Sequence, residues 1–417
     1  MTITLLGRQP IFDRQNQVTF YRLTYRNRPK NDKIPAQALA DFAHNFDTLM
    51  HAIGINAALE DKRGWVKISD QILTKTDLTL LPASKLIFEI EAQVFSIKLS
   101  QIIQEYAEQG YVFALNEALV EDVIAKCGEA YLALFEYVTF NIRKLDIAHY
   151  HAHNKLFDEL AIKRVATHVE TKRGLEIALE MGFDYVCGSF FKEATVIKGK
   201  QLSPHQTTYL QLISLLNNPE STPDIVTLFK HAPSESLQLL SYINSAGLAT
   251  NKTINNIEQA VKLLGPKRLR AWANMMLLAC EEGNFNELLL DTSLMRAYMM
   301  ERLAHILHRD ALMDEAYLVG MLSLADTILA LPMQTLVEKI HLGESVAKAL
   351  ALGEGELGKI LHIVKAIERG NFRQIEIFSR RLNIPFESIH ILLKEAFVYV
   401  RTTKSQLSTT KESTKKA

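Results

Sequence analysis

The stretch VFSIKLSQIIQEYAEQGYVFAL, residues 94–115, decides the fold of the first half of the chain. Apolar residues of its first part recur at helical spacing and would share one face: Phe95, Leu99, Ile102, Ile103 and Tyr106. Gly110 ends this helix, and an apolar strand follows at once. Residues 173–188, RGLEIALEMGFDYVCG, repeat the arrangement with Gly182 as the terminator. Helices that alternate with strands predict a parallel sheet.

Short apolar runs that fit strands recur along this half, at residues 5–12, 18–26, 65–69, 86–90, 111–115, 137–142, 163–169 and 184–188. Eight such strands in order predict a (β/α)₈ barrel. The segment has only about 195 residues, which is at the short end for such barrels. We therefore expect an incomplete or modified barrel, with helices shortened or missing in residues 27–64.

The composition changes near residue 198. The polar connector VIKGKQLSPHQ, residues 196–206, holds a Gly and a Pro, and beyond it apolar residues recur only at helical spacing. The last residues, RTTKSQLSTTKESTKKA, have no apolar face and predict a disordered tail. The predicted fold is thus α/β plus all-α, with a barrel at 1–198, a helical domain at 199–400 and a tail at 401–417.

The composition narrows the functional classes. The chain has 47 Lys plus Arg and 47 Asp plus Glu, and a net charge of zero argues against a nucleic-acid binder. Three distant cysteines cannot form a disulfide framework or a zinc motif, which fits a reducing compartment. No apolar run approaches the roughly 18 residues of a membrane helix, and no signal peptide is apparent. We predict a cytoplasmic protein that binds neither nucleic acid nor membranes.

Several motifs, in their order along the chain, resemble those of one family. The opening RQPIFDRQNQVTFYRLTYRN, residues 8–27, resembles the start of the EAL domain in bacterial EAL–HDOD signalling proteins. The helical half is similar to the HDOD domain at Asn244-Ser245-Ala246, Ala260 to Gly265, Trp272, GMLSLADTILALPM (320–333) and ALALGEGELG (349–358). The resemblance implies an EAL-like barrel, of a class that hydrolyses cyclic di-GMP with two metal ions when active. It also implies an HD-related output domain after the barrel.

The resemblance implies that the catalytic site of the barrel is dismantled. The family's ligand and catalytic positions fall, in chain order, on Arg22, Lys67, Ala92, Asn116, Glu117, Thr139, Asn141, Thr167, Glu170 and Cys187. Of these, only Glu117 and Glu170 are carboxylates, whereas two metal ions need several anionic ligands. Two cations at this site would repel divalent ions. Glu91, next to Ala92, is expected to face the other way. We predict no catalytic residue, no metal and no cofactor.

The remaining polar residues have two interpretations. Glu170 could simply form an ion pair with Arg22 or Arg143. Alternatively, a polar cleft that still receives a ligand or partner could be lined by Arg22, Lys67, Asn116, Glu117, Thr139, Asn141 and Glu170. A cationic floor would suit a phosphate.

The HDOD-like half is also predicted to lack a metal site. The His-Asp doublet of HD phosphohydrolases falls on Ser323 and Leu324, which are poor metal ligands. The motif residues Asn244, Ser245, Gly265 and Trp272 are predicted to be mainly structural. An apolar helical scaffold of this kind suits partner binding.

Three other motifs have plain structural interpretations. His149, His151 and His153 form H-x-H-x-H, and two of them could share a metal, but no carboxylate or thiol at helical spacing completes the set. A solvated start of a helix is expected there. The G-x-G-x-x-G letters at residues 353–358 follow a helix and predict a helix–loop–helix junction, not a dinucleotide site.

Two residue groups of the helical half leave alternatives open. Lys267, Arg268 and Arg270 form either a solvated helix face or a contact to an acidic partner or phosphate. The methionines fill the core or form an adaptable partner surface: Met275, Met276, Met295, Met299, Met300, Met313, Met321 and Met333.

These observations predict a non-enzymatic signalling protein that acts through protein–protein contacts, with a homodimer left open. The first alternative is a receptor for cyclic di-GMP or a related nucleotide. The second is a residual cyclic di-GMP phosphodiesterase.

Overall fold

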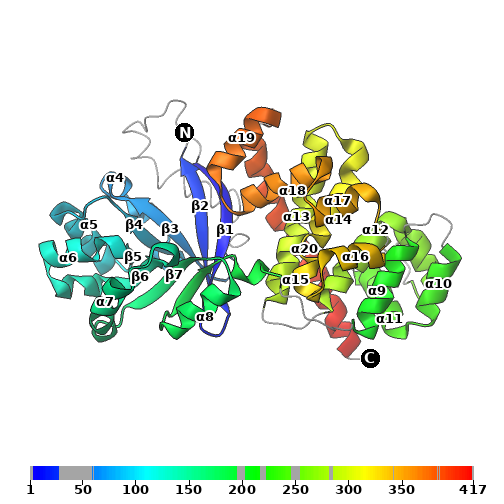
Figure 1. The fold of residues 1–417 in the computed structure, drawn as a ribbon, viewed down its shortest axis with the longest axis horizontal. Coiled ribbons are helices and arrows are strands. Elements are labelled where there is room, and N and C mark those ends of the chain that lie inside the picture. The colour runs from blue at the N-terminus through cyan, green and yellow to red at the C-terminus, as the bar shows by residue number, and fades with distance from the viewer. Residues whose placement is uncertain are drawn as a thin grey trace. The chain divides into compact units, whose positions relative to one another are not determined.

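The computed structural model describes residues 3–27, 59, 61–194, 202–216, 222–245, 254–280, 285–340, 342–382, 384 and 386–415. The chain divides into two compact units, shown in Figure 1. The first comprises Met1–Glu193 with Ile367–Asn371, and the second comprises Ala194–Ala366 with Phe372–Ala417.

The first unit is a closed barrel of eight strands that follow one another in chain order. The strands are β1 Ile3–Asp13, β2 Val18–Asn27, β3 Arg63–Ser69, β4 Leu86–Glu91, β5 Val112–Asn116, β6 Phe135–Asn141, β7 Lys163–Val169 and β8 Tyr185–Gly188. The connections from β4 onward hold helices on the outer side of the barrel (Figure 1): α5 Ile97–Glu108, α6 Val120–Cys127, α7 Ile147–Glu159 and α8 Lys172–Glu180. The predicted EAL-like barrel, with all eight strands, is confirmed.

The expectation of a fully parallel sheet is wrong for β1. Strands β2 to β8 pair in parallel, but β1 is antiparallel to both of its neighbours, β2 and β8. A parallel crossover needs a dozen or more residues, and only residues 14–17 separate β1 from β2. Asp13 closes this turn by accepting hydrogen bonds from the backbone N–H groups of Gln15 and Gln17 at 2.9 and 2.8 Å.

Helices are also reduced between β3 and β4. That connection holds the four-residue helix α4 (Asp70–Leu73) and two short 3₁₀ turns, Leu78–Leu80 and Ala83–Lys85. Residues 28–58, where most of the missing helix was expected, lie outside the described residues.

The barrel interior has an apolar layer formed around four aromatic rings. The centroids of contacting rings lie 5.1 to 5.9 Å apart among Phe20, Trp65, Tyr137 and Tyr185. Side chains two positions apart on a strand point to the same side. The next inward residues after this layer are therefore polar, as in the pairs Phe20 and Arg22, Trp65 and Lys67, Ile87 and Glu89, and Tyr137 and Thr139.

The second unit is helical throughout its described residues. Its helices are α9 Pro204–Leu215, α10 Thr222–Lys230, α11 Pro233–Ser245, α12 Ile257–Ala279, α13 Asn286–Ile306, α14 Met313–Leu322, α15 Ala325–Leu329, α16 Met333–Ile340, α17 Glu344–Ala351, α18 Gly355–Glu368, α19 Phe372–Leu382 and α20 Phe386–Lys415. Within the described part of the chain, no helix has the length and apolar character that a membrane crossing requires.

The HDOD-like motif residues hold this unit together. Gly265 adopts a left-handed φ of 67°, which permits the kink before Pro266 in α12. Trp272 is buried and contacts the rings of Tyr209, Phe229 and Tyr242. Ser245 is the last residue of α11. These positions support the predicted structural role.

The long helix α20 differs from the prediction at its end. Residues 401–415, expected to be a disordered tail, continue this helix. Lys404 lies 3.0 Å from the Asp291 carboxylate and 2.7 Å from that of Glu287, both on α13. Asp291 is buried, so it needs a cation, and this pairing anchors the start of the segment.

Most residues of the two groups left open in the helical half make structural contacts, while Lys267 and Arg268 are exposed. Five of the eight methionines are buried and three are half-buried, so they fill the core and do not form an exposed surface. Lys267 pairs with Glu301 and Asp314, and Arg270 donates to the Leu216 carbonyl. The 353–358 motif joins α17 to α18, so the predicted helix–loop–helix junction is confirmed.

We predict that Asn244 anchors the segment before α12. Its side-chain amide donates to the Ile254 carbonyl and accepts from the Ile254 N–H, both at 3.0 Å. Asn244→Ala should lower the free energy of unfolding by about 1–3 kcal/mol, because both Ile254 groups lose their partner. Urea titration measures this, with exposed Gln259→Ala as a control that changes it by less than about 0.5 kcal/mol. Equal stability of Asn244→Ala and the wild type would contradict this role.

Candidate functional site

A buried carboxylate, Glu89 on β4, occupies the polar layer of the barrel. Its side chain is only 2% exposed. One oxygen, Oε2, accepts hydrogen bonds from Arg22 Nη2 and Trp65 Nε1, each at 2.8 Å. The other, Oε1, accepts from Thr139 Oγ1 at 3.2 Å and lies 3.4 Å from Lys67 Nζ. Four strands, β2, β3, β4 and β6, thus contribute to one ionic cluster.

The electrostatics keep this cluster charged. Burial by itself opposes ionisation of Glu89, but the positive charges of Arg22 and Lys67 and the Trp65 hydrogen bond outweigh it and lower the pKa of Glu89. Burial likewise disfavours charged Arg22, yet Glu89 and the neighbouring Cys187 raise the pKa of Arg22. Burial raises the pKa of Cys187, so it stays a neutral thiol. The buried pair is therefore an ion pair.

Lys67 connects the buried cluster to the surface. Its side chain is 37% exposed, and its Nζ lies 3.6 Å from Oε1 of exposed Glu91. Glu91 was expected to face away from the polar site of the barrel, and this expectation is therefore wrong. Glu91 is two positions from Glu89, so both project from the same side of β4.

Most of the other predicted site residues make local structural contacts. Asn116 and Asn141 each accept a hydrogen bond from a backbone N–H two residues ahead, at 3.1 and 3.2 Å, and so cap short 3₁₀ turns. Oε1 of Glu117 accepts from the Asn141 N–H at 3.4 Å. Its other oxygen is buried and has no hydrogen-bond partner among the described residues, and burial raises the pKa of Glu117.

Glu170 forms an ion pair with Arg143 at the exposed edge of the barrel, as one of its two interpretations predicts. The same edge contains His168, whose φ of 63° is unusual for a residue other than glycine. The pairing of β7 with β8 is irregular between Ala166 and Val169. Partial burial, followed by the charges of Arg22, Arg143 and Lys67, lowers the pKa of His168, and the charge of Glu170 opposes this shift.

Only some of the residues predicted to line the cleft lie together in the structure. Arg22, Lys67 and Thr139 converge on Glu89, and Arg22 and Thr139 are largely buried against it. Sequence reasoning missed Glu89 and His168. A signal for Glu89 existed: a Glu inside the apolar strand LIFEIE is almost never buried without a partner.

The cluster does not fit the two metal ions of an active EAL site. Both oxygens of Glu89 are already bound by protein donors, and two of its partners are cations. A divalent ion here would meet repulsion from both cations.

In the helical unit, the position of the HD doublet also places an arginine beside a residue that is a poor metal ligand. Ser323 is buried, accepts a hydrogen bond from Arg296 Nη1 at 3.0 Å and donates to the Gly320 carbonyl at 2.7 Å. Arg296 is itself buried on α13. A guanidinium group beside Ser323 makes this position unsuitable for a cation.

Comparison with known proteins agrees with this architecture. The HDOD domain family model matches residues 202–353. A protein of Vibrio cholerae described as cyclic di-GMP phosphodiesterase CdgJ is 26% identical over 408 residues, covering 95% of this chain and 92% of that protein. The uncharacterized protein YuxH of Bacillus subtilis is 28% identical over 385 residues, covering 88% and 91%. The chain is thus an EAL-like barrel followed by an HDOD domain.

Solved structures of EAL proteins also align with this chain. A standalone EAL protein of Vibrio cholerae, solved with cyclic di-GMP, is 16% identical and covers 46% of this chain and 91% of its own, with a TM-score of 0.34. The FimX EAL domain of Pseudomonas aeruginosa, also solved with cyclic di-GMP, is 17% identical and covers 46% and 90%, with a TM-score of 0.32.

We predict that Glu89→Gln destabilises the protein by about 3–5 kcal/mol, because it leaves buried Arg22 without its counter-charge. Glu91→Gln is the matched control on the same strand face, and its cost should stay below about 1 kcal/mol because Glu91 is exposed. Chemical denaturation near pH 7 measures both. A cost for Glu89→Gln no larger than that of the control would contradict the cluster's role.

The pH dependence of stability provides a separate test. The folded-state pKa of Glu89 lies below its unfolded value of about 4.3, so its contribution is present above that pH and is lost as the pH falls through the folded pKa. The stability difference between the wild type and Glu89→Gln should therefore shrink below about pH 4. Denaturation curves from pH 7 down to pH 3 measure it. A difference that stays constant would show that folding leaves the pKa of Glu89 unchanged, which would contradict the charge pairing.

Proposed function

We propose that this chain is a non-enzymatic signalling protein that acts through protein–protein contacts and does not hydrolyse cyclic di-GMP. The observation that carries the proposal is the ionic cluster of Glu89 with Arg22 and Lys67. It fills the polar layer of the barrel with mutually paired charges. Phosphodiesterase chemistry of this class would instead require several free anionic ligands for two metal ions.

The relative named as a cyclic di-GMP phosphodiesterase supports the competing proposal of a residual enzyme. Three carboxylates near the barrel end are accessible in this chain or lack a partner: Glu91, Glu117 and Glu170. Two of them are already paired, with Lys67 and Arg143 respectively. The residues of this chain therefore favour the non-enzymatic proposal.

A cyclic di-GMP receptor is the second candidate, and one observation favours it. Two cationic side chains, Lys67 and Arg143, are partly exposed at this end of the barrel, although each is also paired with a carboxylate. Phosphate groups are attracted to exposed cations. The side chains of Lys67 and Arg143 are 37% and 54% exposed.

A hydrolysis assay separates the enzyme from the other two functions. The purified full chain, incubated with cyclic di-GMP and Mg²⁺ or Mn²⁺, should release no linear product above the metal-only blank. CdgJ assayed in parallel checks the conditions. Metal-dependent turnover by this chain would overturn the non-enzymatic proposal, and loss of that turnover in Glu117→Gln would identify the residual site.

Calorimetric titration of cyclic di-GMP, with and without Mg²⁺, separates a receptor from a scaffold. We expect no binding heat at high protein concentration. Micromolar binding without added metal would establish the receptor function instead. In that event Lys67→Gln and Arg143→Gln should weaken binding, whereas Lys155→Gln, an exposed change on α7, should not.

A further inference from the structure

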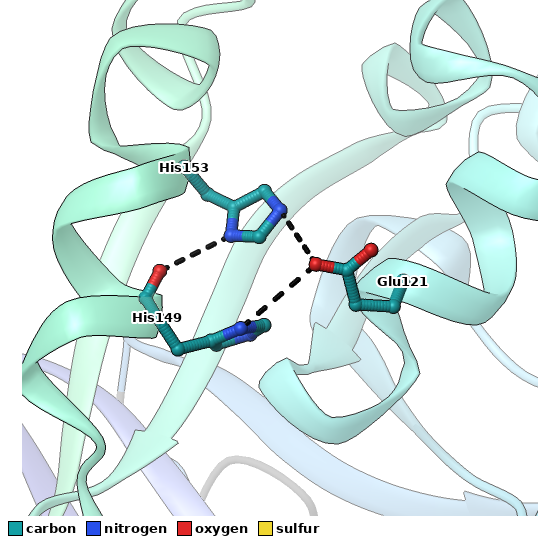
Figure 2. Close-up of side chains that lie close together, drawn as sticks. All are labelled: Glu121, His149 and His153. Carbon is teal, nitrogen blue, oxygen red and sulfur yellow. Dashed lines mark hydrogen bonds and ion pairs between the residues drawn. The ribbon is translucent and has the colours of Figure 1, made fainter.

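A second cluster of metal-binding residue types lies on the outer side of the barrel, on helices α6 and α7. Figure 2 shows Glu121 of α6 facing His149 and His153 of α7. Oε1 of Glu121 lies 3.1 Å from His153 Nε2 and 3.9 Å from His149 Nδ1. Among the described residues, this is the one group of three or more His, Cys, Asp or Glu whose ligand atoms all lie within 4.8 Å.

The H-x-H-x-H motif forms this arrangement because it is helical. His149 and His153 are four residues apart and share one face of α7, with ring centroids 4.7 Å apart. His151 is two residues from each and lies on another face, beside Tyr150. The carboxylate that the sequence did not supply comes from Glu121, 28 positions before His149, so the expectation of a plain solvated helix start is incomplete.

Local hydrogen bonding orients His153 for coordination. Its Nδ1 lies 3.1 Å from the His149 backbone carbonyl. A carbonyl oxygen only accepts, so Nδ1 carries the proton of that hydrogen bond. Nε2, which faces Glu121, is then the atom available to a metal, and a backbone partner on the opposite nitrogen is typical of histidine ligands.

We propose that Glu121, His149 and His153 bind a divalent transition-metal ion, with Zn²⁺ as the first candidate. Tetrahedral zinc with bonds of about 2.0–2.1 Å places its ligand atoms roughly 3.3–3.5 Å apart. The two distances to Glu121 bracket that value, and the three ligand atoms all lie within 4.8 Å of one another. Two imidazoles and a carboxylate suit Zn²⁺ better than Mg²⁺ or Ca²⁺.

The exposure of the cluster fits such a site. The side chains of Glu121, His149 and His153 are 66%, 31% and 12% exposed. The ion can thus enter from solvent, and water can take the fourth position. A bound ion would fasten α6 to α7. These helices follow the 3₁₀ turns that begin at Glu117 and Ile142, so the metal would stiffen one side of the barrel end.

The test is a titration of Zn²⁺ into the full chain, purified without a polyhistidine tag and treated with a chelator. Calorimetry should give one equivalent of tight binding, and Zn²⁺ should raise the unfolding temperature. Co²⁺ as a spectroscopic probe should give visible absorption bands of four-coordinate geometry. His149→Ala should weaken binding by more than about tenfold, since even changes outside the ligand shell reach that size.

The variants are chosen so that misfolding cannot imitate loss of a ligand. His151→Ala is the matched control in the same helix and should bind like the wild type. Glu121→Gln alters an exposed side chain, so its metal-free unfolding temperature should be unchanged while Zn²⁺ affinity falls. The proposal is overturned if the wild type shows no zinc binding, or if Glu121→Gln and His149→Ala retain the wild-type affinity. It does not depend on the proposed function.

Discussion

The buried carboxylate of Glu89 is the constraint on which the interior of the barrel depends. A charge removed from water must be paired and hydrogen-bonded, or the fold loses several kcal/mol. Arg22 on β2, Lys67 and Trp65 on β3, and Thr139 on β6 together meet this requirement. These four side chains all contact Glu89. Internal ion pairs therefore fill the end of the barrel where an active EAL domain would hold its metal ions.

The helical unit has a comparable buried contact at Ser323. Arg296 donates to Ser323, the residue that stands where the first ligand of an HD doublet would be. In both units a buried guanidinium group donates a hydrogen bond to a buried oxygen partner. A buried pair of this kind is costly to break. In both units these contacts hold buried polar groups in fixed positions.

Much of the fold could be predicted from periodicity. The eight strands, the helices after β4 and the change to a helical domain follow from apolar spacing, which reports which side chains are buried. The reversed direction of β1 was missed although the sequence carries its cause, a connection of only residues 14–17. The helix through residues 401–415 was missed because its anchor, Lys404 on Asp291, joins residues 113 positions apart.

The sequence by itself determined the two-part architecture, the two cationic side chains Arg22 and Lys67 on neighbouring strands, and the shared helix face of His149 and His153. These depend on residue type and short-range spacing, which a linear pattern contains. Only the tertiary structure decided that Glu89 pairs with both cations and that Glu121 faces the two histidines. The physical reason is that barrel closure and helix packing set the distances between residues remote in the chain. No periodicity along one strand or helix encodes those distances.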